Sequence, residues 1–382
     1  MKVFFYSGMA GSPWGGSEEL WSRAAIRMAH EGHAVFACVR AWPQPVKQVQ
    51  ALAQSGVKVY HRTEQLPLTQ RAMNKLAHKA GLKPPYGTQV WLRRLLKETQ
   101  PDLVVVSQGG ISDGLQAMET AYQLKIPYMS VVQANSESFW PSDEIADRLL
   151  VVATHARLNM FVARSNRDLF FRQIGQKLNN CCIVWNPPNP TAVCDGSWPV
   201  TDVELSLACV ARLDPIAKGQ DILFEVLAQP QWHERSVRLH LYGTGMNPRS
   251  LSRHAKSLGI EAKVRFEGYV PDVSAIWKKH HALILPSRYE GTPLALVEAM
   301  LCGRPVICTS VAGMADLAQD TFNGFIAETA SIPHLSDCME RAWSNTGELE
   351  KLGQNARKRI KYLMPKDPID EFKQRLISDQ SI

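Results

Sequence analysis

The stretch Leu283–Ser310, LILPSRYEGTPLALVEAMLCGRPVICTS, begins as an apolar strand, passes through a short loop and continues as an apolar helix. Pro293 occupies the first helical position that we expect, where proline is best tolerated, and Thr292 is the expected N-cap. Gly303 can end the helix in a left-handed conformation before a second strand. The window therefore predicts a parallel α/β unit with a helix N-terminus at the carboxyl end of a strand, where open α/β sheets bind ligands.

Two glutamates flank this helix start. Glu290 lies in the loop ahead of the helix, and Glu298 interrupts the apolar run LALVEAML. Both could be ordinary solvated glutamates, but this interpretation fits Glu298 poorly because a buried carboxylate without a partner is costly. A helix N-terminus favours phosphate, and carboxylates accept strong hydrogen bonds from sugar or ribose hydroxyls. The window predicts a site for a phosphorylated, hydroxyl-rich ligand.

On both sides of this window, short β-branched or aromatic runs alternate with longer amphipathic stretches, which predicts parallel sheets covered by helices. Strands are expected at Lys2–Tyr6, Ala34–Val39, Val57–Tyr60, Leu103–Ser107, Tyr128–Val132, Leu158–Val162, Leu205–Val210, Val237–Tyr242, Lys263–Phe266, Ala282–Pro286, Pro305–Thr309 and Gly324–Ile326. Helices are expected at Ser17–Glu31, Gly114–Leu124, Gly219–Leu227, Pro248–Leu258, Val273–Lys279, Pro293–Leu301 and Ile332–Ser344.

The chain length and one stretch rich in Pro, Asn and Gly predict the domain organisation. A chain of 382 residues is too long for one ordinary domain. The stretch 186–200 is dense in Pro, Asn and Gly and is typical of a linker. We therefore expect an α/β fold with two Rossmann-like domains, 1–187 and 201–360. A helical tail, 361–382, is expected to pack back toward the first domain.

The composition is that of a soluble globular protein. No apolar run of about 18 residues or more occurs, so no membrane-spanning helix is expected. The run VFFY near the N-terminus is too short for a secretory signal and is better explained as a first strand. None of the eight cysteines forms a Cys-x-x-Cys pair, which predicts buried thiols in a reducing compartment and a cytoplasmic location.

The net charge of +7 is unevenly distributed, because the stretch 71–97 is strongly basic and also carries Trp91 and several leucines. One interpretation is a solvated helix pair with an apolar core face. Another is a surface that meets anionic lipid or an acidic acceptor, which would bring the protein to the inner face of a membrane. No RNA- or DNA-binding motif accompanies the charge, so nucleic acid is not an expected partner.

The pattern Glu290-x7-Glu298, within SRYEGTPLALVEAMLCGRPVICTSVAGMADLAQDTFNGFIAE, closely resembles the GT4-type (group 1) retaining glycosyltransferases of GT-B fold. The resemblance covers the second half of the chain. It implies that Glu290 contacts the donor sugar, that Glu298 binds the ribose hydroxyls, and that the donor lies in a cleft between the two domains. It also implies that an intervening loop holds sugar and phosphate; the loop residues are Gly291, Thr292, Pro293 and Leu294.

Three further segments resemble parts of that family. In LACVARLDPIAKGQDIL, Arg212 and Lys218 match an Arg-Leu and Lys-Gly signature and would stabilise the departing diphosphate. Viewed alone, each is equally well explained as an exposed surface cation. Gly243 belongs to a Gly-x-Gly turn that packing would also explain, and Tyr269 belongs to a segment that resembles the base-contacting one.

The first domain offers a weaker set of candidates. Gly16 ends a glycine-containing loop that the resemblance implies lets diphosphate and acceptor approach the backbone, and Ser17 is the expected N-cap of the next helix. An ordinary strand-to-helix turn is the alternative. The loop lacks Gly-x-Gly-x-x-Gly spacing, so a nicotinamide-dependent oxidoreductase is not expected.

Many relatives carry a histidine after a mid-domain strand, whereas this chain has none at that point. Acceptor positioning would then fall to Gln133, Asn135 or Glu137. His155 lies later, in an expected helix, and is interpreted as a surface or packing residue.

The resemblance implies a hexosyltransferase that retains anomeric configuration by a front-face route. The donor would be a nucleotide sugar such as a UDP- or GDP-sugar, and the acceptor a glycan, a lipid-linked molecule or a small molecule in surface polysaccharide or glycoconjugate synthesis. No Asp-x-Asp motif occurs, so neither a metal nor another cofactor is expected. Two alternatives remain: an enzyme resembling sugar-nucleotide epimerases, and a non-catalytic nucleotide-sugar-binding protein.

Overall fold

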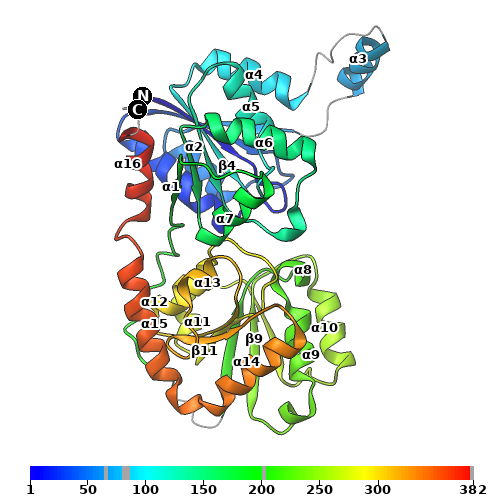
Figure 1. Cartoon of the computed structure of the whole chain (residues 1–382), viewed down its shortest axis with the longest axis vertical. Coiled ribbons are helices and arrows are strands. Elements are labelled where there is room, and N and C mark those ends of the chain that lie inside the picture. Colours follow the sequence, from blue (N-terminus) through cyan, green and yellow to red (C-terminus); the bar gives the residue numbers. More distant parts are fainter. Residues whose placement is uncertain (64–67, 80–86, 200–203, 379–382) are drawn as a thin grey trace. The chain divides into compact units, whose positions relative to one another are not determined.

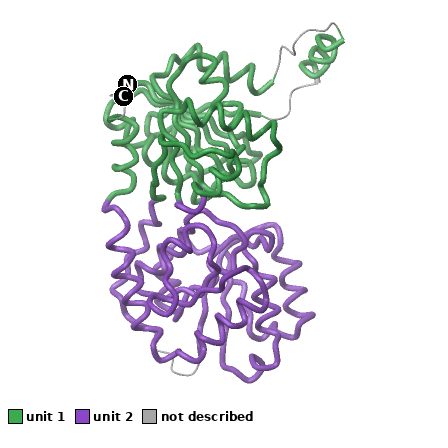
Figure 2. Tube along the Cα trace, in the orientation of Figure 1, with its two compact units in different colours: residues 1–162, 167–186, 367–382 green, residues 163–166, 187–366 purple. Residues whose placement is uncertain are grey.

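The computed structural model describes residues 1–63, 68–79, 87–199 and 204–378, and the chain divides into two compact units (Figures 1 and 2). Unit 1 comprises residues 1–162, 167–186 and 367–382, and unit 2 comprises residues 163–166 and 187–366. Each unit is built on a parallel sheet with helices around it, which confirms the α/β fold with two Rossmann-like domains.

Within the described residues, the sheet of unit 1 has seven parallel strands in the order β3-β2-β1-β4-β5-β6-β7. The strands are β1 (Lys2–Ser7), β2 (Ala34–Arg40), β3 (Lys58–Arg62), β4 (Leu103–Gln108), β5 (Tyr128–Val132), β6 (Leu158–Phe161) and β7 (Cys181–Ile183). The three-residue strand β7 was not expected, because its side chains are only half-buried and its apolar run is very short. The other six lie within two residues of their expected bounds.

Helices cover both faces of this sheet (Figure 1). One face packs on α4 (Thr88–Thr99), α5 (Leu115–Gln123), α6 (Asp143–His155) and α7 (Arg164–Gln173), and the other on α1 (Gly16–His30), α2 (Lys47–Gln54) and α16 (Pro368–Ser378). Successive side chains of β1 enter opposite cores, Phe4 on the first face and Phe5 on the second. The buried strands thus read as continuous apolar runs.

The C-terminal helix α16 belongs to unit 1 (Figure 2). Phe372 and Leu376 are buried in the same cluster as Trp21 of α1, and Arg27 pairs with Asp367 at 2.7 Å. The preceding helix α15 (Leu349–Leu363) belongs to unit 2. The division between the units therefore lies at 366/367, and position 361, where the sequence suggested a tail, is inside a helix.

The sheet of unit 2 has the order β10-β9-β8-β11-β12-β13 among the described residues, and all its pairings are parallel. In chain order this corresponds to 3-2-1-4-5-6, the Rossmann arrangement. The strands are β8 (Leu205–Val210), β9 (Val237–Tyr242), β10 (Val264–Gly268), β11 (Ala282–Leu285), β12 (Val306–Thr309) and β13 (Gly324–Ala327). The remaining helices are α8 (Pro215–Lys218), α9 (Gln220–Leu227), α10 (Pro248–Ser257), α11 (Val273–Trp277), α12 (Leu294–Leu301), α13 (Gly313–Leu317) and α14 (Ile332–Ser344).

The linker, residues 187–199, has no helix or strand but is fixed to unit 2. Arg357 donates to the Cys194 carbonyl at 2.7 Å, and Arg304 donates to the Ser197 carbonyl at 2.6 Å. Cys194 and Cys302 form a disulfide, so the expectation that all cysteines are free thiols is wrong for this pair. The two residues are 108 positions apart, and only the path of the linker past the end of α12 brings them together.

The basic stretch 71–97 forms part of two helices, α3 (Leu68–Lys79) and α4, while residues 80–86 lie outside the described part. Leu92, Leu95 and Leu96 of α4 are buried, as expected for a helix with an apolar core face. In α3, by contrast, Met73 and Leu76 are 48% and 66% exposed, so these two apolar side chains are not buried in a core. Within the described ranges, none of the helices combines the length and hydropathy needed to span a bilayer.

Candidate functional site

Two residues of unit 2 that lie far apart in sequence form a buried ion pair. Lys218 ends α8, and Glu290 lies in the loop between β11 and α12. The Lys218 Nζ and Glu290 Oε1 atoms are 2.6 Å apart, with side-chain exposures of 14% and 9%. Ser287 Oγ donates to the same oxygen at 2.9 Å. Because a buried charge needs both a counter-charge and hydrogen bonds, this arrangement satisfies Glu290 and Lys218 together.

The strand order explains why these two loops meet. Since β8 and β11 are parallel neighbours, their carboxyl ends lie at the same edge of the sheet. Gly219, between α8 and α9, has a φ of +66°, and a Cβ at this position would lie 2.0 Å from the Pro286 carbonyl oxygen. Arg288 N–H also donates to the Ala217 carbonyl at 2.8 Å. A residue without a side chain is therefore needed for this close approach.

The second glutamate, Glu298, is 5% exposed within α12. Its Oε1 accepts the backbone N–H of Asn189, in the linker, at 3.0 Å. Burial raises the pKa of Glu298, and this hydrogen bond partly offsets the effect. Both glutamates are thus buried and hydrogen-bonded, and the interpretation of them as ordinary solvated residues is wrong.

The start of α12 differs from expectation by one residue. The helix begins at Leu294, and Pro293 rather than Thr292 is the N-cap, because its ψ of 123° is extended. No side chain caps the helix, so its first turn presents backbone donors and the positive end of its dipole. The loop is also held by α13, where Gly313 N–H donates to the Gly291 carbonyl at 2.9 Å.

The remaining candidates of unit 2 lie in loops at the carboxyl ends of β8, β9 and β10. The Arg212 side chain is 51% exposed and lies 3.7 Å from Asp214. Gly243 has a φ of +131°, and a Cβ there would lie 2.2 Å from the Ala211 carbonyl oxygen, so packing explains this glycine. Tyr269 follows β10 and is 72% exposed. The structure places all these residues at one edge of the sheet.

The first-domain candidates play mainly internal roles. Gln133 accepts a hydrogen bond from Asn186 at 2.7 Å, and Asn135 donates to Gln173 at 2.7 Å; both are buried. Glu137 is on the surface, with its carboxylate 3.5 Å from the Arg172 guanidinium.

Two further expectations concern the ends of helices in unit 1. Gly16 is exposed at the first position of α1, whose N-cap is Gly15, so the expectation of a Ser17 cap is wrong. His155 ends α6 at the surface, where its ring packs 4.6 Å from that of Tyr122.

A buried carboxyl in unit 1 escaped the sequence analysis. Glu18 is 3% exposed and accepts a hydrogen bond from Ser7 Oγ at 2.6 Å, while Arg62 donates to the Ser7 and Met9 carbonyls at 2.9 and 3.0 Å. Burial raises the pKa of Glu18 to about 7. In the sequence, Glu18 looks like an ordinary acidic residue in the first turn of a helix. Its partner Ser7 is eleven residues away, so no local pattern predicts that the two meet in the core.

In the part of the chain that the structure describes, no group of three or more His, Cys, Asp or Glu side chains is arranged to hold a metal ion.

Comparison with known proteins adds the following. Residues 200–359 match the family of glycosyl transferases group 1. An uncharacterized glycosyltransferase of Haemophilus influenzae is 26% identical over 87% of this chain and 88% of its own length. The poly(ribitol-phosphate) alpha-N-acetylglucosaminyltransferase of Staphylococcus aureus is 26% identical over 40% of this chain, and the match spans only 31% of that relative. The crystal structure of Anabaena Alr3699/HepE in complex with UDP matches with a TM-score of 0.73 and 18% identity, covering 99% of this chain and 100% of that one. With a TM-score of 0.74 to the crystal structure of TarM as well, the chain shares the two-domain GT-B fold of these structures.

Proposed function

Because residues 200–359 match the family of group 1 glycosyl transferases, we propose that the chain transfers a sugar from a nucleoside-diphosphate-sugar to an acceptor. The observation that carries the proposal is the buried pair of Lys218 and Glu290, beside the uncapped start of α12, the helix that also carries buried Glu298. Paired charges at the N-terminus of a helix suit a ligand that combines hydroxyls with phosphate.

In this proposal, Glu290 accepts a hydrogen bond from a hydroxyl of the donor sugar, and Lys218 fixes its carboxylate. Arg212, Lys218 and the backbone donors of residues 291–294 stabilise the negative charge that grows on the departing diphosphate. Donors that are in place before reaction cost no reorganisation when the charge develops. Glu298 is assigned to the ribose hydroxyls, with its second oxygen available beside the one that accepts Asn189 N–H.

We further propose that the sugar is transferred with retention at the anomeric carbon, by a front-face route in which the departing phosphate guides the acceptor hydroxyl. The donor phosphate oxygen takes the proton of the acceptor hydroxyl as the sugar–phosphate bond breaks and the new glycosidic bond forms. Cationic side chains replace a metal in this scheme, so the reaction is expected to proceed in EDTA. UDP is the first nucleotide to test, since a structure of the same fold was solved with UDP; a GDP-sugar is the other candidate.

The acceptor is proposed to be a glycan or lipid-linked molecule, which agrees with a relative named as a poly(ribitol-phosphate) glycosyltransferase. Contact with an anionic membrane surface through α3 is part of the proposal. Its cations Arg71, Lys75 and Lys79 recur every four residues, it has no acidic residue, and it also exposes Met73 and Leu76.

The test starts with thermal shifts of the full chain in a panel of nucleoside diphosphates and nucleotide sugars, because a ligand that binds the folded state raises Tm by mass action. The stabilising donor is then incubated alone and with candidate acceptors. Transfer, or slow release of the free sugar, that is lost in both Glu290→Ala and Arg212→Ala supports the proposal. An isomerised donor would instead identify an epimerase, and binding without any turnover would identify a non-catalytic binder.

A further inference from the structure

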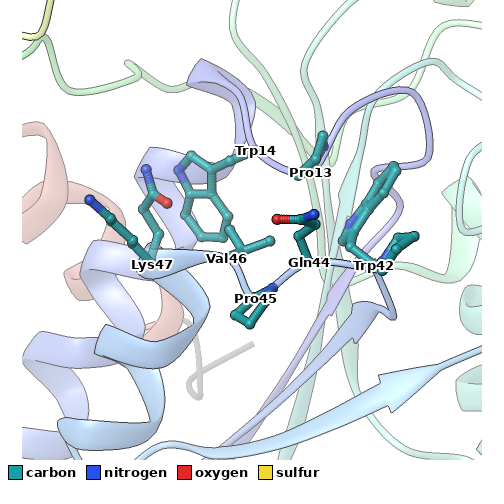
Figure 3. A pocket seen from close by; sticks show the side chains of 9 residues that line it. Pro13, Trp14, Trp42, Gln44, Pro45, Val46 and Lys47 are labelled. Atoms are coloured by element: carbon teal, nitrogen blue, oxygen red, sulfur yellow. The ribbon is translucent and has the colours of Figure 1, made fainter.

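A hollow in unit 1 lies between two neighbouring loops (Figure 3). One loop follows β1 and the other follows β2, and because these strands are parallel neighbours, both loops emerge at the carboxyl edge of the sheet. The hollow has a volume of about 430 Å³, within the range of about 300–1,000 Å³ that is usual for ligand sites. Its lining includes Pro13, Trp14, Trp42, Gln44, Pro45 and Lys47.

Trp14 is held in place by the core beneath it. Its ring lies 6.2 Å from that of Trp21, which in turn lies 5.8 Å from the ring of Phe5 in β1. The indole Nε1 donates to Glu19 Oε1 at 2.8 Å. Its polar edge is thus satisfied, and the side chain remains half-buried at the wall of the hollow.

Trp42 forms a second aromatic wall, and a cation fixes it. The Arg40 guanidinium carbon lies 4.8 Å from the centre of the Trp42 ring. Arg40 also donates to the Ala10 carbonyl at 2.8 Å, which ties the two loops to each other. Three prolines, Pro13, Pro43 and Pro45, further restrict the backbone around the hollow. A ligand that enters therefore meets walls that are already ordered, which reduces the entropy lost on binding.

We propose that this hollow binds a sugar ring of the acceptor glycan. The inference rests on the proposed glycosyltransferase function and assigns a substrate subsite within it. A pyranose has a face of C–H groups that packs on flat aromatic surfaces, while the hydroxyls around its edge need hydrogen-bond partners. The hollow combines two indoles with the amide groups of Gln44 and Gln48, the pairing of apolar walls with few polar groups that is typical of small-molecule sites.

The charge at the rim narrows the ligand class. Lys47 is exposed at the start of α2 and lines the hollow, whereas none of the described residues that line it is acidic. A sugar that carries a carboxylate or phosphate would gain an interaction with this ammonium group. The hollow therefore favours acidic sugars, such as uronates, over neutral ones.

The experiment is saturation-transfer difference NMR on the full chain with methyl β-D-glucoside, cellobiose, methyl β-D-glucuronide and uridine as separate probes. We expect transfer to the ring C–H protons of the sugars, a several-fold stronger signal for the glucuronide, and none for uridine in this hollow. Trp42→Ala should lower the sugar signal at least fivefold, and Trp42→Phe should keep part of it. The matched control is Tyr362→Ala, which removes an aromatic side chain that is 88% exposed in unit 2.

The inference is overturned if no sugar shows saturation transfer, if Trp42→Ala leaves the signal unchanged, or if Trp42→Ala abolishes a uridine signal instead. Thermal shifts with nucleoside diphosphates on the same samples keep the two proposals apart. If the nucleotide shift persists in Trp42→Ala while sugar binding behaves as the wild type, only the acceptor subsite fails. If sugars bind through Trp42 but no nucleotide stabilises the chain, the proposed donor chemistry fails.

Discussion

Lys218 Nζ lies 2.6 Å from Glu290 Oε1, although the two residues are 72 positions apart and both side chains are largely buried. Among the described residues, neither side chain forms an ion pair with any other group. The other side-chain contact of Glu290 Oε1 is with the neutral hydroxyl of Ser287. An ion pair of this kind links the loop after β8 to the loop after β11. It therefore couples the shape of the candidate site to the stability of unit 2.

Removing one member of this pair should affect both stability and activity. Glu290→Gln leaves the Lys218 ammonium buried without a counter-charge, which typically costs about 3–5 kcal/mol. The double variant Lys218→Met/Glu290→Gln should lose less stability than the sum of the single variants. Urea unfolding measures this, and sugar transfer should be abolished in all three. The control is Asp221→Asn, which breaks a more exposed pair with Arg288 and should cost about 1 kcal/mol or less. Equal losses in the two pairs would contradict the assignment.

Glu298→Gln should separate donor binding from turnover. The amide oxygen can still accept Asn189 N–H, so the fold should be kept, but a charge-assisted hydrogen bond to the ribose becomes a neutral one. A loss of about 1.4 kcal/mol corresponds to a tenfold weaker interaction. We expect the KM for the donor to rise about tenfold with kcat changed by less than threefold. A fall in kcat at unchanged KM would instead place Glu298 at the reacting centre.

Glu18 should make stability depend on pH. Its pKa is raised from 4.5 to about 7 by burial, so the folded protein keeps a proton that the unfolded chain releases. Stability is therefore fully present below about pH 4.5 and is lost as the pH rises to about 7, by an amount on the order of 3 kcal/mol. Glu18→Gln should remove this component, which urea midpoints at pH 5.5 and 8 would show. Glu98→Gln, at an exposed position, should leave the pH dependence intact.

Substituting two glycines with similar φ angles should separate the cost of backbone strain from the cost of a steric clash of the new Cβ atom. Gly219 has a φ of +66° and Gly259 a φ of +69°. A Cβ at Gly219 would lie 2.0 Å from the Pro286 carbonyl oxygen, whereas one at Gly259 would meet nothing within 4 Å. Gly259→Ala should cost about 1 kcal/mol from backbone strain alone. Gly219→Ala should cost at least twice as much and should also weaken nucleotide binding. Similar losses of Tm in both variants would show that the two loops can separate without penalty.

Helix α3 should bind anionic vesicles through charge. A triple Arg71→Gln, Lys75→Gln and Lys79→Gln variant removes the regularly spaced cations, and each is worth about 1 kcal/mol near an anionic surface. Co-sedimentation with phosphatidylglycerol vesicles should fall about 100-fold in this variant and also at high salt. The matched control replaces Arg249, Arg253 and Lys256 of α10, which are exposed in unit 2. Binding to neutral phosphatidylcholine that equals binding to anionic vesicles would refute the electrostatic role.

Much of the architecture is readable from local patterns. The observed bounds of β8 and β9 match the predicted ones residue for residue, because both strands carry the buried apolar side chains that a covered parallel sheet needs. In β9 these side chains alternate with half-buried Arg238 and His240. The window from Glu290 to Glu298 also indicates a polar site, since Glu298 lies inside an apolar helix and a buried carboxylate needs a hydrogen-bond partner. What it cannot show is which partner, because Asn189 approaches Glu298 from a linker 109 positions away.

The sequence by itself determined the two parallel α/β units, the strand-to-helix turns that carry Lys218 and Glu290, and the burial of Glu298, because each depends on the order of apolar and polar residues within about one element. Only the tertiary structure decided that Lys218 pairs with Glu290, that Cys194 is bonded to Cys302, that Glu18 lies in the core, and that Trp14 faces the same hollow as Trp42. Those relationships join loops of different strands. Which loops meet depends on which strands are neighbours in a sheet. Strand order is set by the packing of the whole domain, and no single segment of the sequence encodes it.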